Sequence, residues 1–391
     1  IMPKCILPWI SIESTPTGGA RPCCLSNEQI PNINLKKNTL NDAFHSPYMN
    51  NLRQQFIDNK KPKTCTNCWT EEQYGKKSKR QYMLEKFKDV EVDYTSSIPK
   101  KLLFLDLKLG NICNLKCRIC GSWSSSKWAA EELTYVKDST NHIARTWLKE
   151  GRWPRESKVF WESIEEILPH VKYFEFTGGK PMLIKEHFDL LQIAVDKNFA
   201  KDIDIHYNTN TTKLPLDTSI WKNFKHIQIA FSVDNTEERF EYERYGAKWK
   251  IANKNIEQVH KLRDDNNYNI TTQLCATWNV QNIFYLDEVL VWANTMNFNS
   301  IHFNLMHDPW EFSLAKIPMI SKNSIINYLK KLQLKHKKYS HNIAGLKDLV
   351  ASSKQSNTEP LFTKLRQTDL YRNQNFATTH FKMAKVLGYV L

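Results

Sequence analysis

Three cysteines in one short segment carry the strongest chemical signal in this chain of 391 residues. Cys113, Cys117 and Cys120 follow one another in a C-x3-C-x2-C spacing, directly after an apolar run over 102–109. Three thiolates at this spacing can bind three irons of a cubane iron–sulfur cluster. The fourth iron then has no protein ligand, and a catalytic metal requires such an open position. The alternative is structural zinc, which requires four ligands, yet no histidine lies within 111–121.

A second group of cysteines precedes this segment. Cys5, Cys65 and Cys68 provide three thiolates, and one member of the adjacent pair Cys23 and Cys24 provides a fourth. Four thiolates saturate a metal site, which suits electron transfer or a structural role rather than activation of a substrate. A zinc knuckle with four cysteine ligands fits the C-x2-C pair equally well when that pair is considered alone.

An alternation of strands and helices after Pro99 has to position the three-cysteine segment. Apolar runs predict six strands, over 102–109, 173–176, 203–207, 226–232, 270–277 and 300–306. Helical patterns separate or follow the strands, over 186–198, 249–263, 284–296, 324–336, 345–353 and 359–368. We expect two further helices within 122–170, one within 47–57 and one linking helix over 73–88. This order predicts an α/β fold of parallel βαβ units, whose strand carboxyl ends meet on one face.

The C-x3-C-x2-C segment resembles the signature of the radical SAM superfamily, and further motifs follow the predicted strands. Phe176-Thr-Gly-Gly-Lys-Pro181 resembles the GGEP motif of that family, with Lys180 in place of the usual Glu. Residues 207–211 resemble its N-T-N-G tip, with Thr211 in place of Gly. The amino-terminal part resembles the SPASM or twitch auxiliary-cluster domain in nine residues: Cys5, Pro8, Trp9, Gly18, Cys23, Arg53, Cys65, Cys68 and Trp69.

The resemblance implies a fold and a domain order. We expect a partial (β/α)6 TIM-like barrel over 96–318, a small cysteine-rich auxiliary domain over 1–95 and carboxyl-terminal helices over 319–391. In the family the auxiliary domain usually follows the barrel, whereas here it precedes it. Only enough cysteines for one auxiliary cluster are present, so twitch is the better description.

The resemblance also implies cofactors. A [4Fe–4S] cluster on Cys113, Cys117 and Cys120 would be chelated by S-adenosylmethionine, and a second, auxiliary [4Fe–4S] cluster would use the earlier cysteines. The spacing Cys5-x12-Gly18-x4-Cys23 favours Cys23 as its ligand, with Cys24 as the alternative. Contacts to S-adenosylmethionine are expected from seven residues: Thr177, Gly178, Gly179, Asn210, Ser232, Arg244 and Ile119.

The implied function is reductive cleavage of S-adenosylmethionine to a 5′-deoxyadenosyl radical, which abstracts a hydrogen atom from a substrate. Family members act on peptides, proteins and small molecules, and we expect a peptide or protein here, with a small molecule as the second choice. An external electron donor such as flavodoxin or ferredoxin would supply the electron. The reaction outcome does not follow from the sequence.

Composition restricts the remaining possibilities. The net charge of +14 attracts acidic partners and leaves a zinc-stabilised nucleic-acid-binding protein as the alternative function, although no helix-turn-helix, RNA-recognition or zinc-finger pattern accompanies the charge. No apolar run approaches the roughly 20 residues that cross a bilayer, and no secretory signal is evident, so we expect a cytoplasmic protein without a membrane partner. Nine cysteines then indicate metal or redox chemistry rather than disulfides.

Overall fold

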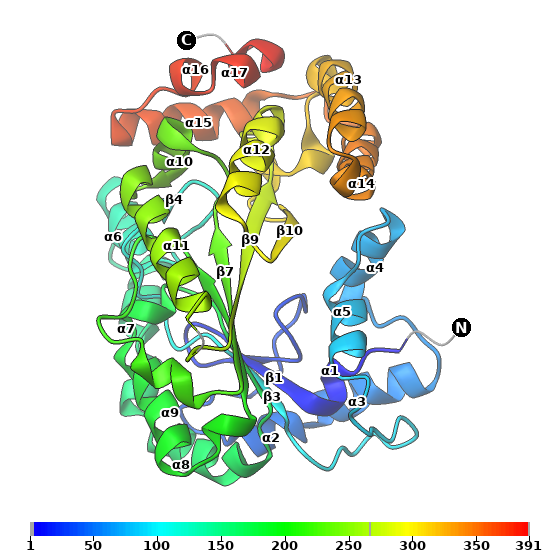
Figure 1. The fold of residues 1–391 in the computed structure, drawn as a ribbon, viewed down its shortest axis with the longest axis vertical. Helices are drawn as coiled ribbons and strands as arrows, with labels where there is room; N and C mark the ends of the chain where they lie inside the picture. Colours follow the sequence, from blue (N-terminus) through cyan, green and yellow to red (C-terminus); the bar gives the residue numbers. More distant parts are fainter. Residues whose placement is uncertain (1–3, 266, 390–391) are drawn as a thin grey trace.

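The computed structural model describes residues 4–265 and 267–389, and its centre is one sheet of eight strands (Figure 1). In sheet order the strands are β10 (Ser300–Leu305), β9 (Ile270–Trp278), β7 (His226–Ser232), β6 (Asp204–Thr209), β5 (Tyr173–Phe176), β3 (Phe104–Leu107), β1 (Ser11–Ser14) and β2 (Ala20–Arg21). All neighbours run parallel except β1 and β2. The six strands from β3 to β10 are those predicted for the barrel, so the α/β partial barrel is confirmed.

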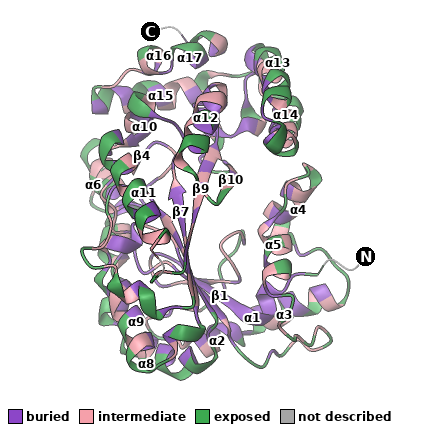
Figure 2. Cartoon of the chain, viewed as in Figure 1, coloured by how far each residue is buried: buried purple, intermediate pink, exposed green. Residues whose placement is uncertain are grey.

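Helices between the strands cover the outer face of the sheet, as Figure 1 shows for α9 (Lys185–Asp196), α11 (Trp249–Arg263) and α12 (Leu286–Met296). Each has one apolar face that packs on the strands; on α11 this face includes Ala252, Ile256 and Val259. Figure 2 shows the consequence, with buried strands at the centre and exposed residues on the outward helical faces.

The segment between β3 and β5 forms three α-helices rather than the two that were expected. They are α6 (Ser126–Tyr135), α7 (Ile143–Glu150) and α8 (Lys158–Ile167). The side chains of Ser125, His142 and Ser157 each accept a hydrogen bond from the first turn of the helix that follows. Three separate caps therefore start three separate helices.

The prediction of one linking helix over 73–88 is also wrong, because a turn between Gln73 and Lys79 interrupts the helix. A helix α4 (Thr66–Gln73) ends before Gly75, whose φ of +70° lies in the left-handed region. The next helix, α5 (Lys79–Lys86), starts at Ser78 with a capping box that involves Gln81. The turn between the two helices allows α5 to face the inner side of the barrel sheet.

The amino-terminal residues extend the barrel sheet instead of standing apart from it. β1 pairs in parallel with β3, and the short helices α1 (Leu7–Ile10), α2 (Leu40–Phe44) and α3 (Pro47–Ile57) pack around this edge. Arg53 holds them together from a fully buried position, donating hydrogen bonds to the carbonyl oxygens of Pro8 at 2.7 Å and Phe44 at 2.6 Å. The cysteine-rich part and the barrel therefore share one sheet.

The carboxyl-terminal part is helical, as expected, and lies at the end of the barrel where β10 finishes (Figure 1). Its helices are α13 (Met319–Lys335), α14 (Ser340–Ser352), α15 (Glu359–Arg372), α16 (Phe376–Thr379) and α17 (Phe381–Leu387). Across the described part of the chain, no helix combines the length and the apolar composition that crossing a membrane requires.

Candidate functional site

The three-cysteine loop begins where β3 ends. Cys117 belongs to a two-residue strand, β4 (Lys116–Cys117), which pairs antiparallel with β8 (Arg244–Tyr245). The thiol of Cys120 hydrogen-bonds to that of Cys117, and Cys113 is near enough that its charge interacts with both. The structure therefore brings all three sulfurs together at the carboxyl ends of the strands.

The surroundings of Cys117 favour its thiolate. The hydrogen bond from Cys120 and the nearby Arg244 guanidinium lower the pKa of Cys117 to about 7, against the opposing effect of burial. The Nη1 atom of Arg244 lies 3.8 Å from the sulfur of Cys117. The pKa values of the other two thiols are raised, that of Cys113 mainly by burial and that of Cys120 mainly by its hydrogen bond to Cys117. The fit to a cluster held by three cysteines therefore depends on the convergence of the three sulfurs.

Arg244 and Asn210, both expected to contact S-adenosylmethionine, lie directly beside the cysteines. Arg244 is buried and forms an ion pair with Asp234, whose Oδ1 atom also accepts a hydrogen bond from the backbone of Thr277 at 2.8 Å. The Asn210 amide is 3.7 Å from the sulfur of Cys113. Both residues thus border the same cluster position, from β8 and from the end of β6.

The Gly-Gly loop after β5 packs against the backbone of the cysteine loop. Gly178 and Gly179 have φ values of +71° and +54°, which L side chains rarely adopt. A Cβ atom on Gly179 would also lie 2.7 Å from the carbonyl oxygen of Ile112. The amide of Lys180 donates to that same oxygen at 2.7 Å, so the two loops are joined one residue before Cys113.

Three further residues that were expected to contact S-adenosylmethionine occupy different surroundings. Thr177 donates to the carboxylate of Asp106 at 3.2 Å and, like Ser232, lines a cavity inside the barrel. Ile119, within the cysteine loop, is partly buried against the apolar core.

The carboxyl-terminal helix α15 anchors the cysteine loop, a contact that no sequence pattern indicated. Arg118 lies between the second and third cysteines, and its guanidinium forms an ion pair with Asp369. Asp369 also accepts a hydrogen bond from the hydroxyl of Tyr242 at 2.8 Å. Arg372 donates to the carbonyl oxygen of Lys116 at 2.7 Å. Charged residues on a helix normally face solvent, so no pattern in the sequence signalled these buried contacts.

The amino-terminal cysteines separate into a group of four and one outlier. Burial raises the pKa of Cys5, and the nearby thiols of Cys65, Cys23 and Cys68 raise it further. These four therefore converge and fit the ligand set of an auxiliary cluster. Cys24 faces the opposite way, where its sulfur lies 2.9 Å from the ammonium nitrogen of Lys79. This geometry favours Cys23 over the adjacent Cys24 as the fourth ligand.

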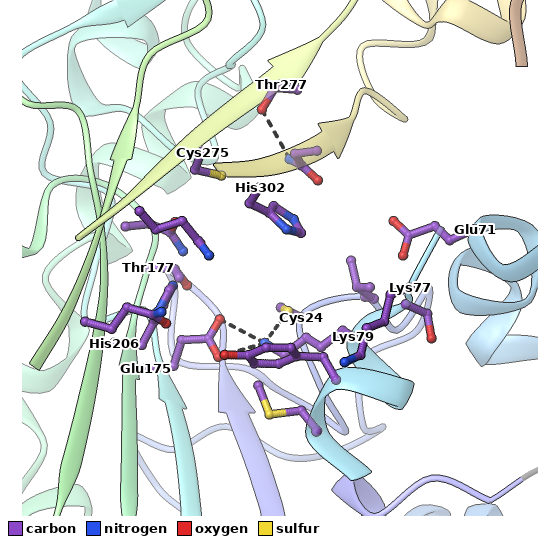
Figure 3. Close-up of a pocket in the computed structure, with 18 of the residues that line it drawn as sticks. Cys24, Glu71, Lys77, Lys79, Glu175, Thr177, His206, Cys275, Thr277 and His302 are labelled. Carbon is purple, nitrogen blue, oxygen red and sulfur yellow. Dashed lines mark hydrogen bonds and ion pairs between the residues drawn. The ribbon is translucent and has the colours of Figure 1, made fainter. Parts of the chain in front are cut away.

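Cys24 opens onto a cavity of about 490 Å³ inside the barrel. Figure 3 shows Glu175, His206, Cys275 and His302 pointing into this space from strands of the sheet and Cys24 from the turn after β2, with α5 opposite. Small barrels are usually filled by branched apolar side chains. Here the inward positions are polar, and the interior is open.

One row of inward-facing side chains crosses five neighbouring strands. Glu13, Asp106, Glu175, His206 and Gln228 are register partners from β1 to β7. This row begins on a strand of the amino-terminal part and continues into the barrel. Glu175, His206 and Gln228 of this row line the cavity. Amino-terminal residues such as Cys24 and Glu71 line it as well, so both parts contribute to its wall.

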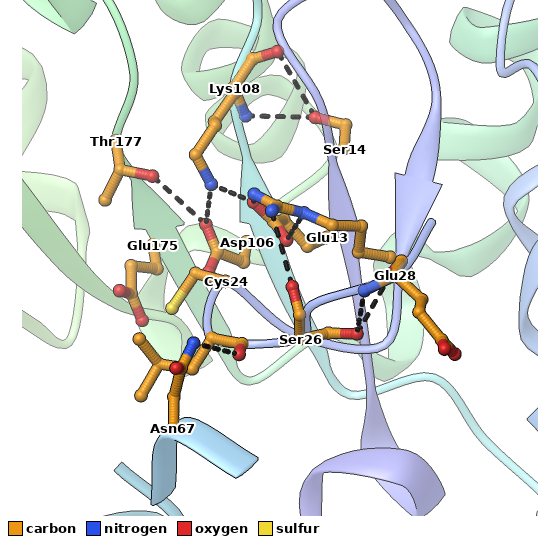
Figure 4. A network of polar contacts seen from close by, with 12 residues as sticks. Glu13, Ser14, Cys24, Ser26, Glu28, Asn67, Asp106, Lys108, Glu175 and Thr177 are labelled. Atoms are coloured by element: carbon orange, nitrogen blue, oxygen red, sulfur yellow. Dashed lines mark hydrogen bonds and ion pairs between the residues drawn. The ribbon is translucent and has the colours of Figure 1, made fainter. Parts of the chain in front are cut away.

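The lysines that line this cavity are already neutralised by carboxylates. The Lys79 ammonium is 2.8 Å from both carboxylate oxygens of Glu175, and Figure 4 shows the adjoining network around Glu13, Asp106 and Lys108. The other wall lysines also have acidic partners: Lys76 with Glu71, Lys77 with Glu85 and Lys108 with Glu13. Burial lowers the pKa of His302 to about 4 and also lowers that of His206, so both imidazoles are neutral.

Two family models match the sequence, one over the amino-terminal cysteines and one over the barrel. The model of the SPASM iron-sulfur cluster-binding domain matches residues 5–69, and the model of the radical SAM superfamily matches residues 107–288. They imply a [4Fe–4S] cluster with S-adenosylmethionine and an auxiliary iron–sulfur cluster, which agrees with the two cysteine sets. No curated protein matches the chain significantly.

Solved structures show distant similarity. The structure of anSMEcpe with bound AdoMet and Cp18Cys peptide is 17% identical, with a TM-score of 0.38, and the match covers 62% of each chain. Streptococcus suis SuiB bound to the precursor peptide SuiA is 12% identical, with a TM-score of 0.37, and the match covers 79% of this chain and 65% of that chain. The chain thus spans less than two thirds of the length of these structures. From the two domain matches and the two cysteine sets, the chain is a member of the radical SAM superfamily in which a SPASM iron–sulfur domain precedes the barrel.

Proposed function

We propose that this chain is a radical SAM enzyme that removes a hydrogen atom from a substrate held in the barrel cavity. The observation that carries the proposal is the convergence of Cys113, Cys117 and Cys120 beside the Gly-Gly loop, at the strand ends of a barrel with an open interior. When bound, the cluster and S-adenosylmethionine supply a 5′-deoxyadenosyl radical for that abstraction.

The residues around the three cysteines are suited to holding the cofactors. Cys113, Cys117 and Cys120 would ligate the cluster, and Cys5, Cys23, Cys65 and Cys68 the auxiliary one. The positive φ of Gly178 and Gly179 exposes backbone groups to an amino acid ligand. Arg244 has a guanidinium geometry that suits a carboxylate, although in the absence of a ligand it pairs with Asp234. Asn210 and Ser232 provide further polar contacts.

The cavity favours a substrate that presents one uncharged polar group. Its volume of about 490 Å³ lies in the ordinary range for one small molecule or one or two side chains. Because the wall lysines are paired and the wall histidines are neutral, the main groups that could orient an uncharged substrate are the wall amides, of Asn208, Gln228, Gln273 and Asn304. The amide nitrogens of Gln273 and Asn304 already donate to Ser300 and Thr277, so these two side chains would act mainly as acceptors. We propose a side chain of a peptide or protein as the substrate, with a small polar molecule as the second candidate.

An acidic electron donor fits the charge of the chain. A net charge of +14 promotes encounter with an acidic protein, and flavodoxin or ferredoxin are donors of this kind. The proposed auxiliary cluster would lie behind the cavity wall, because Cys23 faces it while the adjacent Cys24 faces the cavity. An electron from the substrate therefore has a short route to that cluster.

The test is cleavage of S-adenosylmethionine. We expect anaerobically reconstituted protein to be brown, to hold about eight irons per chain, and to release 5′-deoxyadenosine when reduced by dithionite. Cys117→Ala should abolish release, whereas Ser356→Ala, at an exposed position, should retain it. Equal release by Cys117→Ala and the parent would refute the proposal. A colourless zinc protein that binds nucleic acid with steep salt dependence would establish the alternative instead.

A further inference from the structure

Lys180 is a buried cation with no acidic partner. Its side chain is fully buried behind the cysteine loop, and its ammonium donates to the hydroxyl of Thr209. Within the described residues, no carboxylate lies within ion-pairing distance of it. The buried arginines nearby differ in this respect, since Arg244 is paired with Asp234 and Arg118 with Asp369.

Lys180 contacts two segments beside Cys113: the start of the cysteine loop, and the end of β6, where Asn210 approaches the sulfur. Its backbone amide donates to the carbonyl oxygen of Ile112, the residue immediately before Cys113. Thr209, which accepts from its ammonium, immediately precedes Asn210, and the Asn210 amide is 3.7 Å from the sulfur of Cys113. The ammonium is therefore held close to the cluster position on the side away from solvent.

A buried ammonium is costly unless an anion compensates it. Burial lowers the pKa of Lys180 to about 7, while Cys113 acts in the opposite direction and favours the charged form. A [4Fe–4S]2+ core on three thiolates would carry a net charge of about −1, and reduction by one electron would make it about −2. Both charges would favour the ammonium form of Lys180, and the reduced state would favour it more. A cluster on Cys113, Cys117 and Cys120 would therefore supply the counter-charge that no carboxylate among the described residues provides.

We propose that Lys180 is a positioning residue that raises the reduction potential of the cluster on Cys113, Cys117 and Cys120, which makes the cluster easier to reduce. The inference rests on the proposed function, since it requires a cluster at these cysteines. A fixed positive charge stabilises the reduced cluster more than the oxidised one, because reduction adds a negative charge. Net charge and nearby dipoles are established determinants of cluster potential. The Lys that replaces Glu in the Gly-Gly-Lys-Pro segment therefore has an electrostatic effect on the cluster.

The experiment is an anaerobic redox titration of the reconstituted full chain, poised with dithionite and followed by electron paramagnetic resonance. The signal that changes when S-adenosylmethionine is added reports this cluster rather than the auxiliary one. We expect Lys180→Met to lower the ratio of reduced to oxidised cluster at a fixed poise by about tenfold, which equals about 59 mV for one electron. Lys185→Met removes the same charge from a side chain that is 75% exposed, and it should leave the ratio unchanged within about twofold.

Two further variants separate charge from packing. Lys180→Gln retains a donor for Thr209 without the charge and should shift the potential as Lys180→Met does, whereas Lys180→Arg should not. If Lys180→Met or Lys180→Gln binds the cluster and has the same reduction potential as the parent, the inference is wrong. Loss of the cluster from both neutral variants but not from Lys180→Arg would also overturn it, because the role would then be in assembly. If the parent itself yields no 5′-deoxyadenosine, the proposed function fails; if the parent does but the potentials agree, only this inference fails.

Discussion

Asp369→Asn tests whether the carboxyl-terminal helices hold the cysteine loop. Asp369 neutralises Arg118, whose guanidinium is buried, and two nitrogens of that guanidinium have no hydrogen-bond partner. The Asn side chain has nearly the same volume but no charge. The amide nitrogen of Asn would replace one carboxylate oxygen of Asp369. It would then face a second donor, because Arg118 donates to one of these oxygens and the backbone amide of Phe376 to the other.

The expected cost follows from the burial of the pair. Breaking a buried ion pair by removing one partner destabilises a protein by about 3–5 kcal/mol, since the remaining charge is uncompensated. At an unfolding entropy of about 2.1 cal/mol/K per residue, a chain of 391 residues loses about 4–6 °C in Tm. Because Arg118 lies between Cys117 and Cys120, we also expect faster loss of iron to a chelator.

The assay is thermal unfolding of anaerobically reconstituted protein at one fixed scan rate, together with timed iron release. Asp348→Asn is the matched control, since the side chain of Asp348 is 60% exposed and its lysine contact is 3.8 Å long. A surface pair of this kind contributes at most about 1 kcal/mol, so its Tm should change by about 1 °C or less. Equal Tm values and iron release for Asp369→Asn and the control would refute the anchoring role.

Three further predictions follow from single contacts. Cys23→Ser should remove the auxiliary cluster, about half of the iron, while Cys24→Ser should retain the full iron content; the reverse result would reassign the ligand. Burial lowers the pKa of His187 to about 3, below its unfolded value of about 6.5. Its contribution to the free energy of unfolding is therefore fully present above pH 6.5 and is lost as the pH falls, because only the unfolded state then takes up a proton. The stability of His187→Gln, measured by urea unfolding, should therefore fall less steeply than that of the parent, by about 1.4 kcal/mol per pH unit between pH 6 and pH 4; equal slopes would contradict this. Gly179→Ala should weaken binding of S-adenosylmethionine at least tenfold in equilibrium dialysis, because its Cβ would collide with the cysteine-loop backbone; parental affinity would contradict it.

Local patterns in the sequence were sufficient for much of the fold. The predicted bounds of α3 (Pro47–Ile57) and α11 (Trp249–Arg263) agree with the structure, because Ser46 caps the start of α3 and an apolar stripe runs along α11. The six barrel strands were predicted from apolar runs, and the matched radical SAM region contains the cysteine spacing that indicated the family. Such features depend only on residues near one another in the chain.

Tertiary packing decided the rest. Cys23 and Cys24 are neighbours in the sequence, and only the folded turn sends one sulfur toward Cys5 and the other toward Lys79. The pairing of β1 with β3 joins Ser11 to Phe104, which are 93 positions apart. The ion pair of Arg118 with Asp369 joins residues 251 positions apart. No local spacing encodes such contacts, because they depend on which surfaces meet once each element has formed.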